Sequence, residues 1–494
     1  MRQRTIDSGY VIETLAGDAE VRQANTTLKA DSIIISRRTS IAEAFGNVKI
    51  NDNDSIFTSA QYLRYLGRER IAYLKKKVVF TDRKGVLYTD DLEYNLRTGI
   101  ATYKNGGKII NQQSVLTSTE GIYYADTKDV YFRKNVHLVD PKYNITTDSL
   151  LYNTRTQIAT FIAPTRIVSE DGIIETKSGT YNLQTGEAIF YDRTAIRDKD
   201  HFAIADKMAY DEKTKILQME GHAKLVDSVN KVTVVGNTIF LDKGKNSFLA
   251  YNKPVMILYR DNDSTYIAAD TLFSGLRKYD TVAKKQVLVN DTLKKAAAIN
   301  TNTNDTSIRY FLAFHHVRIF NDSLQAVSDS LYYSTADSTF KLFYDPVIWN
   351  AQTQVNGDTI YLFTENQKAK RLYVFNNGMI VNRANAQMYN QLGGRTINGY
   401  FKEGNIDYMR VKGSPAESIS YPQDDDSAYV GMNRSSSDVI DIYFVNKDVN
   451  KVKFVNDVNG TMYPIRKIPE DQKYLRNFEW KDKRRPKNKL ELFE

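Results

Sequence analysis

The amino-acid sequence predicts an all-β fold, an elongated antiparallel β-jellyroll built of strand-corner-strand repeats of about 29 residues. Two observations lead to this prediction: a short motif returns at nearly constant spacing, and apolar residues within each copy alternate with a period of two. Composition agrees, because 33 Tyr and 22 Phe stand against only 9 Pro in 494 residues, and aromatic side chains favour strands. An apolar content of 41% is enough for a buried core.

The repeat is clearest in TTDSLLYNTRTQIATF, residues 146–161, which has close counterparts in YTDDLEYNLRTGIATY (88–103) and IADKMAYDEKTKILQM (204–219). The copies are aligned on their Asp, or on the residue that replaces it, at Asp31, Ser59, Asp90, Ser118, Asp148, Lys177, Asp206, Gly236 and Asp270. Successive positions lie 28 to 34 residues apart, which is the spacing of stacked repeats rather than of independent domains. The pattern resumes at Asp329 and Asp358.

Four segments follow from this alignment. Residues 1–276 and 308–455 carry the repeats, and residues 277–307 form a polar insertion between the two strands of one repeat. Residues 456–494 are a C-terminal extension, in which PEDQKYLRNFEWKDKRRPK (469–487) predicts a short helix and a basic tail. This extension is either a cap on the end of the array or a solvated tail.

Each repeat predicts a bend within its first strand. Ile145 and Thr147 share one parity, whereas Leu150 and Tyr152 share the other, and a strand changes its inward face only at a bulge or corner. Asp, Ser or Gly suits such a corner, because a short side-chain oxygen can accept freed backbone N–H groups and Gly takes unusual dihedrals. The recurrent Asp is therefore expected to be structural rather than catalytic.

The returning strand carries a box of the type Gly46-Asn47-Val48, where a second bulge is expected. Apolar residues of one parity on either side of this box predict a continuous interior. Positions of the opposite parity carry polar residues such as Arg133 and Lys224. The candidate interior residues are Val48, Ile50, Val130, Phe132, Val136, Leu138, Phe190, Ile196, Leu217, Met219 and Leu225.

Several kinds of chemistry are disfavoured by the sequence. Cysteine is absent, which excludes disulfides and thiolate metal sites. The five His residues do not stand at ligand spacings, and no phosphate-binding Gly-rich loop or nucleophile elbow occurs. We therefore expect no enzyme, no catalytic residue, no metal and no cofactor. The net charge of +9 either suits an anionic partner such as a phosphate-bearing lipid or serves solubility; nucleic acid is not an expected partner.

The repeated pattern x-A-D-x-L-x-Y-[ND]-x-x-T-x-x-A-x-Φ-x-G-N-V-x-I, with Φ apolar, resembles the OstA-like family of lipopolysaccharide-transport proteins from about Gly17 to Val381. The ending GTMYPIRKIPEDQKYLRNFEWKDKRRPKNKLELF, residues 460–493, resembles the tail of the large OstA-like proteins of Bacteroidetes-type bacteria, which are Gram-negative. The resemblance implies an open, twisted jellyroll in the periplasm. Its apolar interior would hold lipid acyl chains while sugars and phosphates face outward.

On this resemblance, the expected function is non-enzymatic binding of lipopolysaccharide during its transport to, and assembly at, the outer membrane. The interior residues named above would then bind lipid. Expected partners are lipopolysaccharide through its lipid A acyl chains, other jellyroll components of the transport bridge through edge-strand pairing, and further copies of the chain itself. The alternative is a structural β-solenoid scaffold or adhesin with a dry core and no lipid ligand.

Two features depart from the usual bridge protein of this family. The chain is far longer, and its first residues, MRQRTIDSGY, lack the apolar core of a secretory signal. Gly17 to Val21 matches the second half of a repeat whose first strand would begin before residue 1. We therefore expect the natural reading frame to start upstream and to add a signal sequence and at least one strand.

Overall fold

A computed structural model describes residues 2–7, 10–82, 85–259, 264–278, 307–365, 368–446 and 448–493. The all-β prediction is confirmed: the described chain consists of antiparallel strands, and the helices among these residues are short 3-10 turns near the C-terminus. Residues 279–306 of the expected insertion lie outside the described residues. The chain divides into two units, Met1–Gly221 (unit 1) and His222–Glu494 (unit 2).

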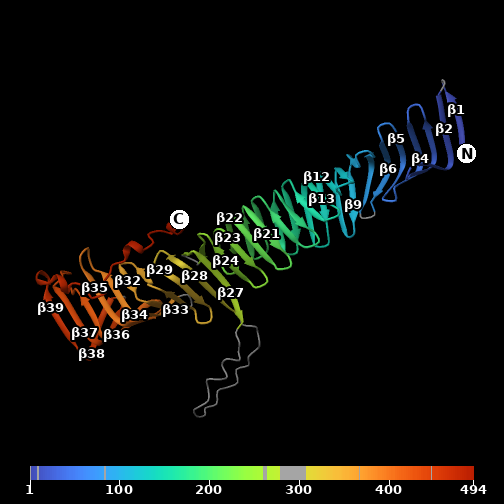
Figure 1. Ribbon diagram of the computed structural model, residues 1–494. Helices are drawn as coiled ribbons and strands as arrows, with labels where there is room; N and C mark the ends of the chain where they lie inside the picture. The colour runs from blue at the N-terminus through green and yellow to red at the C-terminus, as the bar shows by residue number, and fades with distance from the viewer. Residues whose placement is uncertain are drawn as a thin grey trace, which may run out of the picture. The chain divides into compact units, whose positions relative to one another are not determined.

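Unit 1 is built from strands that follow one another as successive rungs (Figure 1). Strand β22 (Ile216–Asp227) contains the boundary between the units. The strands before it are β1 (Arg2–Asp7), β2 (Tyr10–Gln23), β3 (Thr26–Ser36), β4 (Ile41–Asp52), β5 (Ile56–Leu66), β6 (Ile71–Thr81), β7 (Val86–Asn95), β8 (Ile100–Tyr103), β9 (Gly107–Asn111), β10 (Ser114–Ser118), β11 (Glu120–Tyr124), β12 (Asp129–Val139), β13 (Tyr143–Asn153), β14 (Ile158–Phe161), β15 (Thr165–Ser169), β16 (Gly172–Thr176), β17 (Gly179–Asn182), β18 (Glu187–Phe190), β19 (Thr194–Arg197), β20 (His201–Ala205) and β21 (Lys207–Asp211).

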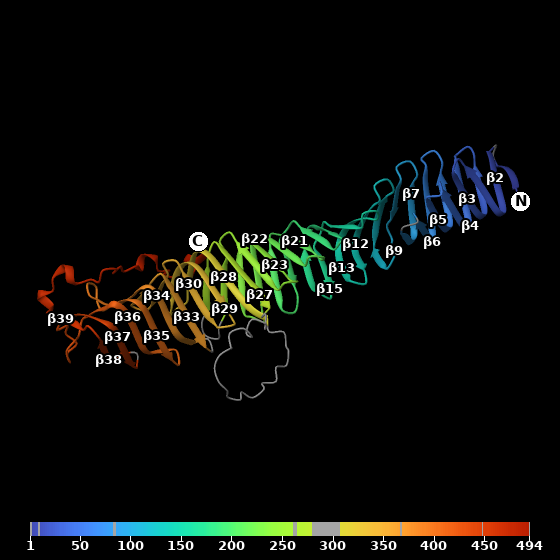
Figure 2. The same ribbon diagram turned by 60° about the horizontal axis from the view of Figure 1, so that its bottom comes forward.

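Unit 2 continues with the same kind of rung (Figure 2). Its strands are β23 (Val232–Asp242), β24 (Ser247–Tyr251), β25 (Val255–Tyr259), β26 (Ser264–Ala268), β27 (Thr271–Lys278), β28 (Ser307–Phe320), β29 (Gln325–Ser334), β30 (Thr339–Phe343), β31 (Val347–Asn350), β32 (Thr353–Asn356), β33 (Thr359–Glu365), β34 (Lys368–Arg383), β35 (Tyr389–Lys402), β36 (Asn405–Ser420), β37 (Gly431–Val445), β38 (Asp448–Val455) and β39 (Asn459–Pro464). The 3-10 turns η2 (Ile465–Lys467), η3 (Glu470–Gln472), η4 (Asp482–Arg484) and η5 (Lys489–Phe493) follow.

Each repeat consists of one rising and one returning strand, and neighbouring strands pair antiparallel, as β3 does with β4 and β4 with β5. The strands bend at their middle. On β12 the residues Lys134 and Asn135 lie between the paired residues Arg133 and Val136, whose partners Ser149 and Thr147 flank Asp148 alone. Two residues thus oppose one, which is the arrangement of a β-bulge and bends the strand.

Nine of the bulges in the described residues share one backbone conformation. Two consecutive residues take positive φ, and most of them are not Gly. These pairs are Gly17–Asp18, Gly46–Asn47, Lys76–Lys77, Lys134–Asn135, Gly221–His222, Asn252–Lys253, His315–His316, Tyr344–Asp345 and Asn376–Asn377. A left-handed residue costs energy unless it is Gly, so the bend recurs at an energetic cost that the surrounding pairing must offset.

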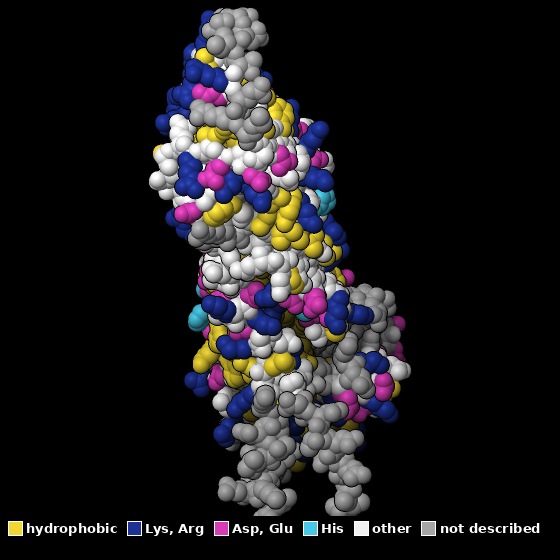
Figure 3. All heavy atoms as spheres, turned by 90° about the vertical axis from the view of Figure 1, so that its right-hand side faces the viewer, with side chains coloured by type: hydrophobic (Ala, Val, Ile, Leu, Met, Phe, Trp, Pro, Cys, Tyr) yellow, Lys and Arg dark blue, Asp and Glu magenta, His cyan; other side chains and the backbone are white. Residues whose placement is uncertain are grey.

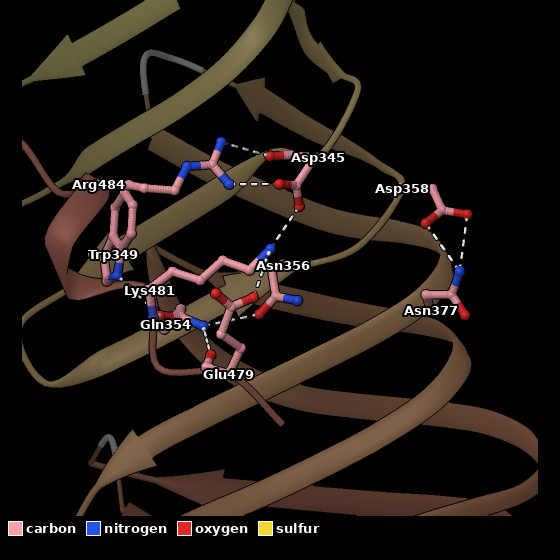
Figure 4. Close-up of polar contacts among 9 residues, drawn as sticks. All are labelled: Asp345, Trp349, Gln354, Asn356, Asp358, Asn377, Glu479, Lys481 and Arg484. Carbon is pink, nitrogen blue, oxygen red and sulfur yellow. Dashed lines mark hydrogen bonds and ion pairs between the residues drawn. The ribbon is translucent and has the colours of Figure 1, made fainter. Parts of the chain in front are cut away.

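The recurrent Asp completes the bend. Its backbone N–H donates to the carbonyl of the first bulge residue, at 2.9 Å from Asp206 to Gly221 and 3.2 Å from Asp358 to Asn376. The sequence predicted that the carboxylate accepts backbone N–H groups, and this occurs at Asp90, which accepts from the Lys77 N–H at 3.2 Å. Elsewhere the carboxylate accepts a side-chain amide instead, as in Asn377 Nδ2 to Asp358 Oδ1 at 3.0 Å (Figure 4).

The bends fold the sheet of each unit into two facing halves. Half A holds the segments that follow the bulge in the returning strands, such as Val48–Asp52 and Val136–Val139, together with the segments that pair with them. Half B holds the segments before the bulge, such as Ile41–Phe45 and Asp129–Arg133, with their partners. The halves are continuous along the line of bulges.

In unit 2 the C-terminal segment Ile465–Phe493, here called the strap, covers the outer face of half A. It runs back along the unit from β39, and the Phe493 ring contacts that of Tyr266 on β26 at a centroid distance of 6.4 Å (Figures 1 and 2). Leu475 packs into a cluster with Met379 and Val381, and Leu492 into a second cluster on β25 and β26. Half A of unit 2 is therefore apolar on both faces, as in a sheet covered on both sides.

Buried glutamine side chains hold the strap. Gln354 Nε2 donates to the Glu479 carbonyl at 2.8 Å, and its Oε1 accepts the Lys481 N–H at 2.7 Å (Figure 4). Gln391 repeats this pattern with the Lys473 carbonyl and the Leu475 N–H, both at 2.8 Å. An amide side chain offers one acceptor and two donors, so each glutamine pairs with the strap backbone much as a neighbouring strand would.

Charged side chains add to this attachment. Lys481 Nζ and Arg484 Nη1 contact the Asp345 carboxylate at 2.7 and 2.6 Å (Figure 4). Burial alone would raise the pKa of Asp345, but the two cations hold this pKa below its usual value.

The helix expected after Pro469 is only the 3-10 turn Glu470–Gln472. The outer face of half A carries exposed polar residues such as His137 in unit 1, whereas in unit 2 Val347 and Trp349 on this face are buried beneath the strap.

The bend can be tested at two glycines that both have positive φ. A Cβ at Gly46 (φ 68°) would collide with the Asp31 carboxylate, whereas a Cβ at Gly17 (φ 78°) would meet no atom within 4 Å. Both Gly46→Ala and Gly17→Ala should cost about 1–2 kcal/mol for the left-handed backbone, and Gly46→Ala should cost more because of the collision. Urea midpoints measure the difference; equal losses would contradict the close approach of Asp31 to the bulge.

Removing the strap tests what it covers. Deletion of residues 469–494 takes away Leu475 and Leu492, which are 4% and 1% exposed, and uncovers the apolar outer face of half A. Large exposed apolar patches promote association, so the truncated protein should bind a hydrophobic dye and sediment at a higher mass than the intact chain. An unchanged mass without dye binding would show that the strap covers no adhesive surface.

Candidate functional site: the interior and its seam

The two halves enclose an apolar interior in each unit. Nine of the eleven candidate residues are buried, among them Val48, Phe132, Val136 and Met219, all at 0% exposure. Ile50 and Ile196 are only half-buried, because each lies close to the turn that ends its strand. The structure thus places the candidates inside; whether they bind lipid stays a prediction.

Further residues line the same interior. Ile33, Leu74, Ile145, Leu150 and Phe161 are fully or almost fully buried. They have the same inward parity on the strands between those that the sequence analysis singled out, so the same alternation could have identified them. The lining is therefore continuous from rung to rung of unit 1.

Side chains fill most of this interior. The rings of Phe161 and Phe190 stack at a centroid distance of 6.5 Å. An interior hollow beside Phe80, Leu87 and Tyr103 measures only about 40 Å³, which is room for very few water molecules. A lipid acyl chain can occupy this space only if the two halves move apart.

A row of tyrosines marks where the halves meet opposite the bulges. Tyr94, Tyr123, Tyr152, Tyr181 and Tyr210 follow one another every 29 residues, near the turn-side end of half B. Polar residues at the turns of half A face them. These are Asp52, Asp82, Asn111, Asp140 and Asp171. We call the line between the tyrosine row and this polar row the seam of unit 1.

Side-chain contacts close the seam. Tyr123 Oη donates to Asp82 Oδ2 at 2.8 Å, and Asn111 Nδ2 donates to Tyr152 Oη at 3.5 Å, each pair being 41 residues apart. One rung further, the rings of Tyr143 in half A and Tyr181 in half B meet edge to face at a centroid distance of 5.4 Å. The seam is thus held by phenol rings and hydroxyls rather than by backbone pairing.

Burial raises the pKa of the tyrosines at the seam. The pKa values of Tyr94 and Tyr181 rise to about 12, first through burial and then through nearby carboxylates. Burial and then the hydrogen bond to Asp82 raise the pKa of Tyr123 as well. Because a carboxylate accepts hydrogen bonds, the neutral phenol is the form that can donate across the seam.

The outer surface carries mixed charges with apolar patches between them (Figure 3). On the outer face of half A near the N-terminus, an open hollow of about 520 Å³ is lined by Lys29, Lys49, Phe57 and Val79, among others. Lys29 and Lys49 are direct partners across β3 and β4, and like charges in that position repel each other. Glu20 relieves part of this repulsion, because its carboxylate lies 3.1 Å from Lys29 Nζ.

Within the described residues, no group of three or more His, Cys, Asp or Glu side chains is arranged to hold a metal ion. None of the helices in the described part of the chain has the length and apolarity needed to cross a membrane.

Bent antiparallel rungs around an apolar interior define a β-jellyroll repeat protein. The profile of the family described as OstA-like protein matches residues 5–148 and 144–206 of the chain. One similar solved structure is LptH of Pseudomonas aeruginosa, the LptA-homologous periplasmic component of the conserved lipopolysaccharide transport device. It is 13% identical over 21% of this chain and 79% of that chain, with a TM-score of 0.20. No curated protein matches the chain.

The alkaline stability of the fold should report the seam. A tyrosine whose pKa is raised in the folded state contributes stability that is complete below its unfolded pKa of about 10 and is lost as pH rises through the folded value. For Tyr94 and Tyr181 that value is about 12. The urea midpoint should fall between these limits, together with the appearance of tyrosinate absorbance, and Tyr94→Phe should flatten the fall. Titration of these phenols at their unfolded pKa in the folded protein would contradict their burial.

Proposed function

We propose that the chain is a non-enzymatic, periplasmic component of lipopolysaccharide transport that carries lipopolysaccharide acyl chains in the interior of the folded sheet toward the outer membrane. The match of the OstA-like family profile to residues 5–206 supports a role in this transport. The carrier role depends on one observation, the continuous apolar lining of buried residues such as Phe132, Leu150 and Phe190.

The energetics of such a carrier are hydrophobic. An acyl chain that leaves water gains about 0.8 kcal/mol per buried methylene, and an interior of repeated rungs offers equivalent positions along its length. Outward residues such as Arg133 and His137 are exposed, and the hollow lined by Lys29 and Lys49 also lies on an outer face. A lipid with its chains inside would therefore meet a polar exterior with its sugars and phosphates.

Partners would join at the edges of the sheet. Among the described residues β38 pairs only with β37, which leaves one edge of β38 available for another strand. An unpaired edge strand is a template for β-augmentation. We propose that other jellyroll components of the transport bridge, or a further copy of this chain, pair at such edges.

Close packing favours a second candidate function. The hollow beside Phe80 measures about 40 Å³, and interior rings such as Phe161 and Phe190 contact each other directly. A scaffold or adhesin with a dry core would have this kind of interior and would need no lipid. The two candidates differ in whether lipid ever reaches the buried side chains.

Site-specific photo-crosslinking separates the candidates. A photoreactive residue at Phe132 or Leu217, both buried, should capture lipopolysaccharide in cells, whereas the exposed positions Arg133 and Lys224 should not. Arg133 is the direct neighbour of Phe132 and therefore a matched control for local position. Equal capture from both faces would refute an interior site, and no capture at any position would favour the dry-core scaffold.

A further inference from the structure

We infer that the seam of unit 1 is the route by which acyl chains reach the interior. The tyrosine row acts as a latch, because its side-chain contacts hold the seam closed, and as a lip, because its rings line the edge of the opening that the lipid passes. This inference rests on the proposed carrier function and specifies its site. The hollow beside Phe80 and Tyr103 measures only about 40 Å³, so an acyl chain can enter there only if the halves move apart, and the structure offers two lines along which they could separate.

The line of bulges is unsuited to opening. Every strand that bends there passes covalently from one half to the other, and backbone hydrogen bonds such as Asp206 N–H to the Gly221 carbonyl at 2.9 Å reinforce it. Opening this line would break the backbone pairing of successive rungs. The bulges are therefore the hinge side of the folded sheet.

In the described residues, the contacts that close the seam join side chains rather than backbone groups. They are the contacts of Tyr123 with Asp82, of Asn111 with Tyr152, and of the Tyr143 ring with the Tyr181 ring. At the surface Lys142 Nζ lies 3.5 Å from Glu212 Oε1, and these two residues are 74% and 41% exposed. Exposed ion pairs contribute little stability, so the buried side-chain contacts, such as Tyr123 to Asp82, are the ones that hold the seam closed.

The spacing of the contacts allows the seam to open one rung at a time. Both hydrogen-bonded pairs join residues 41 positions apart, and the tyrosines recur every 29 residues. Separation at one rung therefore breaks the contacts of that rung, such as those of Tyr123 and Lys128 with Asp82, and leaves the next rung in place. A chain-like apolar ligand could occupy the opened rungs while the others stay closed.

The tyrosines also suit the chemistry of the ligand. Tyr94, Tyr123 and Tyr152 are 8–9% exposed, so their rings lie inside while their hydroxyls reach the polar row at the lip. Amphipathic tyrosines are common where an apolar region meets water. A phenol released from Asp82 can donate to an acyl ester or amide carbonyl, the group that joins an acyl chain to a sugar headgroup.

Bridging the seam tests the route. The natural chain has no cysteine, so Lys142→Cys with Glu212→Cys supplies the only two thiols, which a short bis-maleimide can join across the seam. The matched control is Arg166→Cys with Glu175→Cys, an exposed pair 3.8 Å apart on adjacent strands of half A. With a photoreactive residue at Phe190, bridging the seam should lower the capture of lipopolysaccharide several-fold, and bridging the control pair should not.

A second measurement needs no lipid. Ala101 is 1% exposed and pairs with Tyr123, so the thiol introduced by Ala101→Cys reports access of a small maleimide to the interior. Tyr123→Phe keeps the ring and removes the hydroxyl, and should raise the modification rate several-fold. Tyr131→Phe, on the outward parity of β12, is the control and should leave the rate unchanged.

The outcomes separate this inference from the proposed function. If the bridged protein captures lipopolysaccharide at Phe190 as well as the unbridged protein does, the seam is not the route, although the carrier function stands. If the unbridged protein captures none, the carrier function fails and the route fails with it. If Tyr123→Phe leaves the modification rate unchanged, the tyrosine row is not a latch.

Discussion

The fold depends on the bulge that bends each rung, which in many copies is made by two left-handed residues opposite one Asp. A flat antiparallel sheet of these strands would have two outer faces and no interior. The bulge at pairs such as Gly46–Asn47 bends a returning strand together with the rising strands that pair with it, so the bends line up and the sheet closes on itself. The hydrogen bond from the Asp N–H to the bulge carbonyl holds this alignment from copy to copy.

The bend also determines which line between the two halves is held by backbone pairing and which is held by side-chain contacts alone. Backbone pairing and covalent continuity lie along the bulges, so the opposite line depends on whichever side chains stand at the turns. In unit 1 those side chains are the tyrosines and their polar partners. The same repeat thus produces both the apolar interior and the line of side-chain contacts that closes it at the seam.

Much of this could be read from the sequence. The period of about 29 residues, the change of parity at Asp148 and the inward alternation around Phe132 predicted the repeat, the corner and the buried lining, because each is a local property of one or two strands. Other features depend on residues that no local pattern connects. Asp82 meets Tyr123 across 41 positions, and a polar turn residue gives no sign of its partner.

The strap shows the same limit. Val347 and Trp349 have the parity of exposed residues, and only the return of a distant segment buries them. The glutamines that hold this segment look like ordinary polar strand residues in the sequence. The filling of the interior was equally inaccessible, because an open groove and a packed core use the same alternation of apolar side chains.

The strap gives the two units different freedom to evolve. Its backbone must meet Gln391, then Gln354, and then place Arg485 beside Gln325. A repeat duplicated or lost between these glutamines would put the remaining ones out of step with a segment of fixed length. The strap therefore fixes the number of rungs in unit 2. In unit 1 the contacts recur from one copy to the next, so gene duplication can add rungs there without a matching change elsewhere.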